Sequence, residues 1–502
     1  MSEPSACWGW NAFALIEDAS LPRLPNLGAA IRFAPRWELA IRPLMSRHSV
    51  APDRASTLSF WLLVNFLAIL WVAGGASRAD VLGQAVVRFS AWSIIVVAIL
   101  ALPRVDWRAV KEPAIILGAA ALLVALQLIP LPPSIWTELP GRAIFAEAAV
   151  LTGTDQPWRP LSISPSGTSN ALASLIVPAV VLLLAANLTR EQHWRIAMFV
   201  LGLIVAGTIL GVLQFSGANF DNPLINTVPG AVAGNFANRN HFALFLAIGC
   251  VLALAWAFRD ETPSWKVGAA FGLIVIFVLV ILATGSRSGV VVGLSGMVMT
   301  FLAFRKHAAK QFNTISRKIA VPFIIVVIAV VIGAIWVSVS FDRAVSVDRA
   351  TMLEGEADLR LQIWPIVLGM FQDFFPAGTG FGTFDPVFRI SESDNLLNPQ
   401  YINLAHNDWL QIFLEGGLAG VFLLAASLIW SALRSIQAWY PPQFQTRSRS
   451  LAQAASIVMA LIMMASVTDY PSRTPMVMAL VALAASWLVK SRSNGADNRK
   501  TN

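Results

Sequence analysis

Residues 341–420 read FDRAVSVDRATMLEGEADLRLQIWPIVLGMFQDFFPAGTGFGTFDPVFRISESDNLLNPQYINLAHNDWLQIFLEGGLAG. This stretch is the one long polar excursion in a chain that otherwise returns repeatedly to apolar runs of membrane-spanning length. It carries charged residues, a turn region with Gly378, Gly380 and Gly382, and His406 at the start of the next apolar run. Long loops in compact proteins are usually functional. We therefore expect the rest of the chain to be a membrane frame that holds this loop over a site at one face.

The composition is that of an integral membrane protein. The 502 residues are 56% hydrophobic and only 13% charged, whereas soluble domains contain about 25% charged residues. The formal net charge is +8, but the basic residues lie in short segments between apolar runs and form no single patch. This distribution is typical of cytosolic membrane loops and argues against a nucleic-acid partner. Two cysteines, Cys7 and Cys250, are too few for a disulfide framework.

Apolar runs of about 20 residues predict the transmembrane helices. We expect twelve, at 58–76, 84–102, 113–130, 171–187, 195–215, 240–258, 266–284, 287–304, 319–340, 406–432, 451–468 and 476–490. The predicted fold is an all-α polytopic membrane bundle with a large loop, 341–405, between helices 9 and 10.

Lysine and arginine concentrate in one set of the predicted loops, which includes 104–111, 305–318 and 434–449. The positive-inside rule places this set in the cytosol, together with both termini. The opposite set includes the two long loops 131–170 and 341–405, and we expect it to face outward, towards the periplasm of a cell that has one.

Three regions follow from this topology. Residues 1–56 contain scattered arginines and no continuous apolar core, so we expect a cytosolic N-terminal tail and not a signal peptide. Residues 57–490 form the transmembrane domain, and residues 491–502 form a short polar cytosolic tail.

A first candidate site lies just before the sixth predicted helix, in the segment GNFANRNH at 234–241. It places Arg239 among amide side chains at an outward-facing helix N-terminus. Backbone N–H groups and a guanidinium that point the same way suit an anion. An interfacial arginine that only extends its head group to the water fits Arg239 equally well.

A second candidate is the tight hairpin ATGSRSG at 283–289. Arg287 in an outward turn breaks the positive-inside pattern, and such a cation is costly unless it is paired or faces a polar cavity. This favours a functional role for Arg287. Glycines recur every fourth residue at Gly285, Gly289 and Gly293, which predicts a smooth helix face for close packing.

A third candidate opens the tenth predicted helix, where His406 and Asn407 precede Asp408. The helix dipole disfavours an imidazolium at this end, so His406 is expected to be a neutral ring able to act as a general base. The polar residues Asp408, Gln411 and Glu415 are spaced to lie on one stripe of that helix. Glu415 lies deep enough to need a partner, and it either braces the site or hydrogen-bonds within the bundle.

Missing motifs narrow the chemistry. The sequence contains no G-x-x-x-x-G-K-[ST] and no H-E-x-x-H, so neither ATP nor a zincin-type metal site is expected. Outward arginines beside a neutral base suit a transfer reaction on a lipid-linked diphosphate. Arg239 and Arg287 would neutralise the leaving group, and His406 would take the proton of an attacking hydroxyl.

Over residues 211–420 the sequence resembles the O-antigen ligase and polymerase superfamily. The most specific feature is His406-Asn407 followed by the spaced glycines Gly417 and Gly420. The other matching features are the asparagine-rich GNFANRNHFA, the hairpin TGSRSG, Arg360 with Trp364 and the three loop glycines, and weaker likeness at 160–163 and 469–475.

The resemblance implies a GT-C-like membrane glycosyltransferase with an undecaprenyl-diphosphate-linked glycan as donor. It also implies an acceptor hydroxyl on lipid A core or another glycan, inversion at the anomeric carbon, no metal or other cofactor, and a place in the bacterial inner membrane. By position the implied roles are a base at His406, diphosphate binding at Arg239 and Arg287, a glycan or phosphate contact at Arg360, and support from Asn407 and Glu415.

Two other functions stay open. A polymerase would use the same donor with a second lipid-linked glycan as acceptor. A solute transporter would also suit twelve helices, but transporters show paired repeats and charges near the membrane midplane. Here the charges gather at one face and no half-repeat is evident, which favours the transferase.

Overall fold

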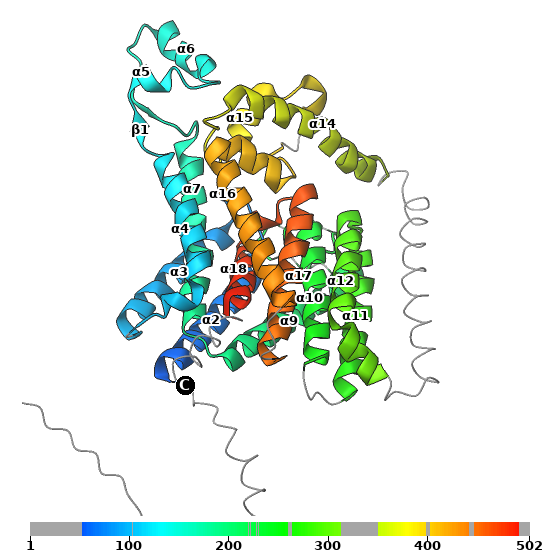
Figure 1. Ribbon diagram of the computed structural model, residues 1–502. Coiled ribbons are helices and arrows are strands. Elements are labelled where there is room, and N and C mark those ends of the chain that lie inside the picture. Colours follow the sequence, from blue (N-terminus) through cyan, green and yellow to red (C-terminus); the bar gives the residue numbers. More distant parts are fainter. Residues whose placement is uncertain are drawn as a thin grey trace, which may run out of the picture. The chain divides into compact units, whose positions relative to one another are not determined.

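The computed structural model describes residues 53–102, 104–218, 220, 222–226, 228, 230–259, 264–312, 350–397, 402–440 and 446–490. Within these ranges the chain is almost entirely helical, with one small sheet of two short antiparallel strands, β1 (Pro130–Leu131) and β2 (Arg159–Pro160) (Figure 1). The expected all-α polytopic membrane fold is confirmed. The N-terminal residues 1–52 and the C-terminal tail 491–502 lie outside the described residues, so their roles stay predictions.

Nine helical segments in the described part of the chain are long and apolar enough to cross a membrane. They are α2 (Arg54–Ala73), α3 (Leu82–Ala101), η1 (Trp107–Val110) with α4 (Lys111–Leu126), α7 (Pro165–Ser174) with α8 (Ile176–Ala186), α9 (Arg190–Phe215), α10 (Arg239–Ala257), α11 (Ser264–Ala283), α16 (Asp408–Trp439) and α17 (Thr446–Thr468).

Two more predicted spans are helices with shorter apolar parts. These are α12 (Arg287–Phe312) and α18 (Pro475–Lys490). The predicted span 319–340 lies outside the described residues. Every one of the other eleven predicted spans therefore coincides with a helix, because an apolar run of this length satisfies its backbone in lipid only as a helix.

Helix α10 lies at the centre of the bundle and packs against α9, α11, α12 and α17. It is almost entirely buried, because small residues let its neighbours approach closely. A Cβ on Gly249 would lie 2.7 Å from Ile204 and 2.8 Å from Phe277, and a Cβ on Gly289 would lie 2.3 Å from Ala243. The predicted glycine face of α12 is thus confirmed at Gly289, whereas Gly285 serves the turn with a φ of +65°.

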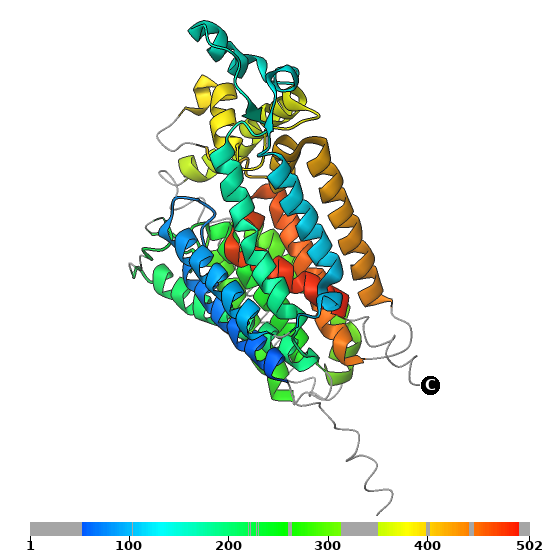
Figure 2. The ribbon, with the colours of Figure 1, turned by 90° about the vertical axis from the view of Figure 1, so that its left-hand side faces the viewer.

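The two long loops of the sequence build one structure, which we call the cap: the described residues of 130–164 and 350–405. It contains α5 (Pro133–Trp136), α6 (Ala143–Thr152), α14 (Ala350–Phe374), α15 (Phe384–Ser391) and η2 (Asp394–Leu396). Figures 1 and 2 agree that these elements lie at one end of the helices. The cap has its own apolar core, in which Phe145 and Ile163 of the first loop pack on residues of the second.

Arg142 joins the two loops of the cap. Its fully buried guanidinium donates to the carbonyls of Leu161 (2.8 Å) and Gly378 (2.9 Å), and it lies over the rings of Trp136 and Phe374. Burial lowers the pKa of Arg142 to about 10, so the side chain stays charged at neutral pH. One arginine therefore fixes the first loop to the glycine turn of the second.

The glycine turn docks on a kink in α16. Gly417 has a φ of +55° inside the helix, and the N–H of Leu418 donates to the carbonyl of Pro376 (2.9 Å). A Cβ on Gly417 would lie 2.3 Å from that carbonyl oxygen. Gly378 is equally confined, because its Cβ would lie 2.6 Å from the Gly417 nitrogen. These contacts explain why both positions are glycine.

The loops that the sequence assigned to one side of the membrane do share one end of the bundle. The N–H of Met476 in α18 donates a hydrogen bond to the carbonyl of Gly74 in the α2–α3 turn (3.1 Å). The hydroxyl of Ser286 in the α11–α12 hairpin donates to the side-chain oxygen of Asn240 in α10 (2.7 Å). The cap occupies this same end. That this end faces the periplasm, with the termini in the cytosol, stays a prediction.

Candidate functional site

Helix α16 begins directly after His406. The Asn407 side chain caps the helix by accepting hydrogen bonds from the N–H groups of Trp409 (3.0 Å) and Leu410 (3.1 Å). Of the non-glycine residues that the structure describes, His406 alone has a positive φ, +49°. This left-handed conformation is unfavourable for a residue with a Cβ, and such strain is found most often at functional sites. The N-cap at Asn407 therefore fixes His406 in a backbone conformation that few non-glycine residues adopt, and this conformation sets the direction of its imidazole.

The imidazole of His406 meets the carboxylate of Asp469, which immediately follows α17. Its Nδ1 lies 3.5 Å from Oδ1 of Asp469, whose side chain is 2% exposed, against 26% for His406. The N–H of Asp408 also donates to the Asp469 carbonyl (3.2 Å), and the ring of Tyr470 stands edge-on to His406 at 4.9 Å. Because Nδ1 faces the carboxylate, Nε2 on the other side of the ring is the nitrogen able to take a proton from a substrate.

Asp469 also gathers the first candidate segment. Its Oδ2 accepts hydrogen bonds from the amides of Asn238 (2.9 Å) and Asn240 (2.6 Å). Asn238 is the N-cap of α10, which fixes the start of the helix that carries Arg239. The asparagine-rich segment that the sequence singled out is thus anchored on the partner of His406.

The second candidate, the Ser-Arg hairpin, is joined to the same network. The Ser286 hydroxyl donates to Oδ1 of Asn240 (2.7 Å) and accepts a hydrogen bond from the N–H of Gly289 (2.8 Å). A continuous path of hydrogen bonds therefore leads from Asp469 through Asn240 to the first turn of α12.

The two arginines of these segments lie close to this path. Nη1 of Arg239 is 3.8 Å from the position that a Cβ on Gly285 would occupy, so the guanidinium reaches the hairpin. Arg287 is the first residue of α12 and is exposed, whereas Arg239 is half-buried. Two guanidiniums beside two helix N-termini make this region suitable for an anionic group.

A second histidine, His241, approaches Asp469 from the buried side. Its Nε2 lies 3.9 Å from Oδ1 of Asp469, and its Nδ1 hydrogen-bonds the hydroxyl of Thr474 (2.9 Å). The ring stands edge-on to Tyr470 at 5.2 Å and is 2% exposed. His241 is therefore buried against the carboxylate, whereas His406 is partly exposed.

Glu415 has the partner that its depth requires. Arg473, in the turn η3 (Pro471–Arg473), donates to Glu415 (3.0 Å) and to Asp408 (3.3 Å). Gln411 donates to the other oxygen of Glu415 (2.9 Å). The predicted polar stripe of α16 is thus a buried network that binds this helix to the 469–475 turn. Because His406 precedes α16 and Asp469 begins the turn, the network fixes both residues relative to each other.

Charge balance stabilises both ionised groups in the 469–475 turn. Burial alone would raise the pKa of the Asp469 carboxyl, but the His406 and His241 imidazoles and the Asn240 amide outweigh burial and hold it well below its usual range. Burial would likewise lower the pKa of Arg473, but Glu415 and Asp408 outweigh burial and raise it. Asp469 is therefore an anion at neutral pH, positioned to stabilise an imidazolium on His406.

Arg360 does not join this cluster directly. It is half-buried on α14, the cap helix that packs against α16. Among the described residues, no hydrogen bond or ion pair connects Arg360 with His406, Asp469 or Arg239. Its predicted contact with a glycan or phosphate stays a proposal.

Sequence reasoning assigned no role to His241, Asp469, Tyr470 or Arg473. One signal was available for Arg473, because it is an arginine in an outward turn between apolar helices, as Arg287 is. Asp469 and Tyr470 stand in the same short DYPSR segment. His241 gave no such signal, since nothing in its local sequence indicates that it lies against Asp469.

The O-antigen ligase family model matches residues 271–425. This match runs from α11 into α16 and contains Arg287, Arg360 and His406. The chain carries an O-antigen ligase domain. A search of the curated proteins gives no match. Arg239 and the 469–475 turn lie outside the matched residues, yet they contact the network of the O-antigen ligase domain through Asn240 and Asp469.

An O-antigen ligase domain among several membrane-spanning helices indicates membrane glycan processing of the ligase or polymerase type. The geometry suits this chemistry. A histidine backed by an ionised carboxylate can accept a proton, and nearby guanidiniums can neutralise a phosphorylated leaving group.

Proposed function

We propose that this protein is a glycosyltransferase that moves a glycan from undecaprenyl diphosphate to an acceptor hydroxyl, on lipid A core or another glycan, at the periplasmic face of the bacterial inner membrane. One observation carries the proposal: His406 faces the buried Asp469 at 3.5 Å inside a hydrogen-bonded network that also holds the arginine-bearing segments. The O-antigen ligase domain supports the class of donor and acceptor.

In the proposed reaction an acceptor hydroxyl oxygen attacks the anomeric carbon as the bond from that carbon to the diphosphate oxygen breaks. Nε2 of His406 takes the hydroxyl proton, and Asp469 stabilises the resulting imidazolium. Arg239 and Arg287 neutralise the charge that develops on the departing diphosphate. The products are the glycosylated acceptor and undecaprenyl diphosphate.

This single displacement inverts the anomeric carbon. It needs no nucleotide, because cleavage of the bond between the glycan and the diphosphate supplies the driving force. It is also proposed to need no metal, since the guanidiniums carry out the charge neutralisation that a divalent cation would otherwise provide. Arg360, on the cap, is proposed to contact the glycan or a phosphate.

The surface glycan of a deletion strain tests the proposal and identifies the acceptor. The measurement is a gel that resolves bare lipid A core from core with one repeat and core with long chains. A ligase predicts bare core while long chains persist on the lipid carrier. Loss of long chains while single repeats still reach the core would instead identify a polymerase. An unchanged pattern for both would refute transfer to lipid A core, so that either another glycan is the acceptor or the proposed reaction is wrong.

The proposed orientation has its own test. Leu151 is 78% exposed on α6 of the cap. In a Cys7→Ser background the remaining native cysteine is Cys250, which is buried and gives little background labelling. A Leu151→Cys variant should react in intact cells with a thiol reagent that does not cross the inner membrane. Reaction only after the membrane is opened would place the cap in the cytosol and overturn the periplasmic assignment.

A further inference from the structure

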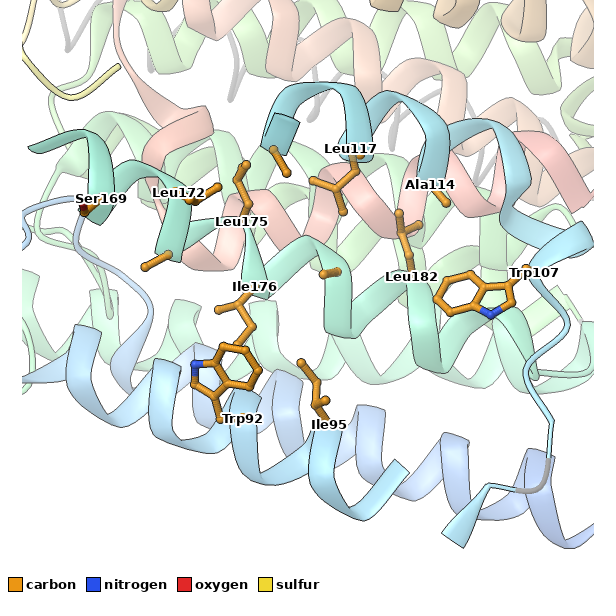
Figure 3. A pocket seen from close by; sticks show the side chains of 14 residues that line it. Trp92, Ile95, Trp107, Ala114, Leu117, Ser169, Leu172, Leu175, Ile176 and Leu182 are labelled. Atoms are coloured by element: carbon orange, nitrogen blue, oxygen red, sulfur yellow. The ribbon is translucent and has the colours of Figure 1, made fainter. Parts of the chain in front are cut away.

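An apolar trough of about 650 Å³ lies between α3, α4 and α7–α8. Figure 3 shows Trp92 and Ile95 of α3 across from Ile176, with Leu117 of α4 on another side. Trp92 and Trp107 are 62% and 51% exposed, so the trough opens on the surface of the helices. Because the lining helices are predicted to span the membrane, the trough opens to the hydrocarbon core of the bilayer. An apolar trough open to lipid accepts hydrocarbon chains.

Arg88 lies inside the membrane-spanning part of α3. It is six residues after the helix begins at Leu82, which is about 9 Å along the axis. Its guanidinium donates to the side-chain oxygen of Asn170 and, at 3.4 Å, to the Asn170 carbonyl. Its Nε is buried without a hydrogen-bond partner. No carboxylate in the described ranges forms an ion pair with Arg88, so these residues give the cation no countercharge.

The arginine and the trough belong to one site. Arg88 is one helical turn before Trp92 on the same face of α3. Asn170 is adjacent to Ser169, the one polar residue of the trough lining. The bridge between Arg88 and Asn170 therefore closes the end of the trough nearest the cap, where a lipid head group would lie.

We propose that this trough binds a membrane phospholipid, with its chains in the apolar part and its phosphate on Arg88. A phosphate supplies the missing countercharge, and a guanidinium matches phosphate geometry well. A cation at this depth is costly without such a partner.

The occupant is a phospholipid of the surrounding membrane and not a reacting substrate. No lining residue of the trough comes from α10, α12, α16 or the 469–475 turn, which carry the catalytic cluster. Leu117, Leu175 and Leu182 separate the trough from a second cavity of about 340 Å³, which reaches Asp408. The bound phospholipid thus supports one wall of this second cavity, whose lining also includes Ser472 of the 469–475 turn.

The test counts bound lipids by native mass spectrometry in two steps. The first counts the phospholipid that remains after delipidation in mild detergent, and the second measures the affinity for added phosphatidylglycerol. The wild type should retain one tightly held phospholipid. Arg88→Met should weaken this binding by about tenfold or more, the loss expected for one charge-assisted hydrogen bond. Arg78→Met is the matched control, because Arg78 lies in the preceding loop and pairs with Asp80.

A second variant tests the trough without touching the charge. Gly118 lines the trough, and a Cβ there would meet nothing within 4 Å. Gly118→Leu should therefore fill the space without a clash and displace the lipid. Unchanged phosphatidylglycerol binding in both Arg88→Met and Gly118→Leu would overturn the proposal. A retained polyprenyl-linked molecule in place of a phospholipid would also overturn it, because the trough would then hold a substrate.

Discussion

The two sides of Asp469 carry the same kinds of residue and differ in what they can do. On the open side lies His406, with Arg239 and Arg287 nearby. On the closed side lie His241 and the buried carboxylates of Asp408 and Glu415, which Arg473 binds. Both histidines approach Oδ1 and stand edge-on to Tyr470, but His406 is 26% exposed and His241 only 2%. Contact with Asp469 therefore does not by itself decide which histidine acts as the base. Exposure to substrate decides it, and this favours His406.

The largest expected effect is on the open side. His406→Ala should lower the rate of glycan transfer by about 10²–10⁴-fold, the usual contribution of a general base. The amount of inserted protein and its unfolding temperature should stay near those of the wild type, because the side chain is partly exposed and held by few contacts. The measurement is transfer to acceptor per inserted protein.

His241→Ala is the matched comparison for that variant. Equal losses of rate in the two variants, at equal stability, would contradict the division between an open and a closed side. Full activity in His406→Ala would remove His406 from the mechanism.

On the closed side the largest effect is on stability. Arg473→Met leaves the buried carboxylates of Asp408 and Glu415 without their cation, which should lower the free energy of unfolding by about 3–5 kcal/mol. Adding Glu415→Gln should recover part of this loss. Thermal unfolding in detergent checks both values.

Arg434→Met controls for the loss of an arginine from the same network of helices. Arg434 pairs with Glu112 between α16 and α4, where Glu112 is 34% exposed. Because water can solvate that carboxylate, the expected loss is smaller, about 1 kcal/mol. A larger loss in Arg434→Met than in Arg473→Met would contradict the account of the closed side.

The frame and the open side were more predictable than the closed side. Apolar runs predict the helices because length and hydropathy alone decide which segments span lipid. Arg239, Arg287 and His406 were singled out as candidates because each stands at a helix end or in a turn of the predicted topology. Asp469 could not be assigned from its local sequence, since its role depends on a contact with His406, 63 positions earlier in the chain.

The cap shows the same limit. Two long loops were predicted, but not that they share an apolar core or that Arg142 joins them. Arg142 lies in a loop where a cation has no local signal, and its partners are backbone carbonyls, which every sequence contains. The glycines were more informative: Gly378 and Gly417 stand where the turn and α16 meet, and a Cβ at either would clash with backbone.

A smaller effect on the open side concerns the leaving group. Arg287→Met should weaken binding of undecaprenyl diphosphate by about 10–100-fold, the loss expected when a charge-assisted hydrogen bond is removed. Arg239→Met should act similarly. Stability should change little for the exposed Arg287. Binding measured in nanodiscs, with Arg78→Met as control, checks this, and unchanged affinity in both variants would exclude diphosphate binding by these arginines.

The smallest expected effect sharpens the comparison between the histidines. His241→Leu removes the hydrogen bond to Thr474 and should cost about 1–2 kcal/mol of stability. Transfer per folded protein should fall by less than about tenfold, because the His241 side chain is only 2% exposed and a substrate cannot reach it. A loss as large as that of His406→Ala would mean that His241 takes part in proton transfer.

The most direct measurement is the single-turnover rate of purified Asp469→Asn with a lipid-linked glycan donor and its acceptor. Asparagine keeps the shape of the side chain but cannot stabilise an imidazolium as a carboxylate does. We predict a rate about 10²–10³-fold below the wild type, with nearly unchanged donor binding, because Asp469 acts through His406. A rate equal to that of the wild type would contradict the central claim that His406 and Asp469 together form the base.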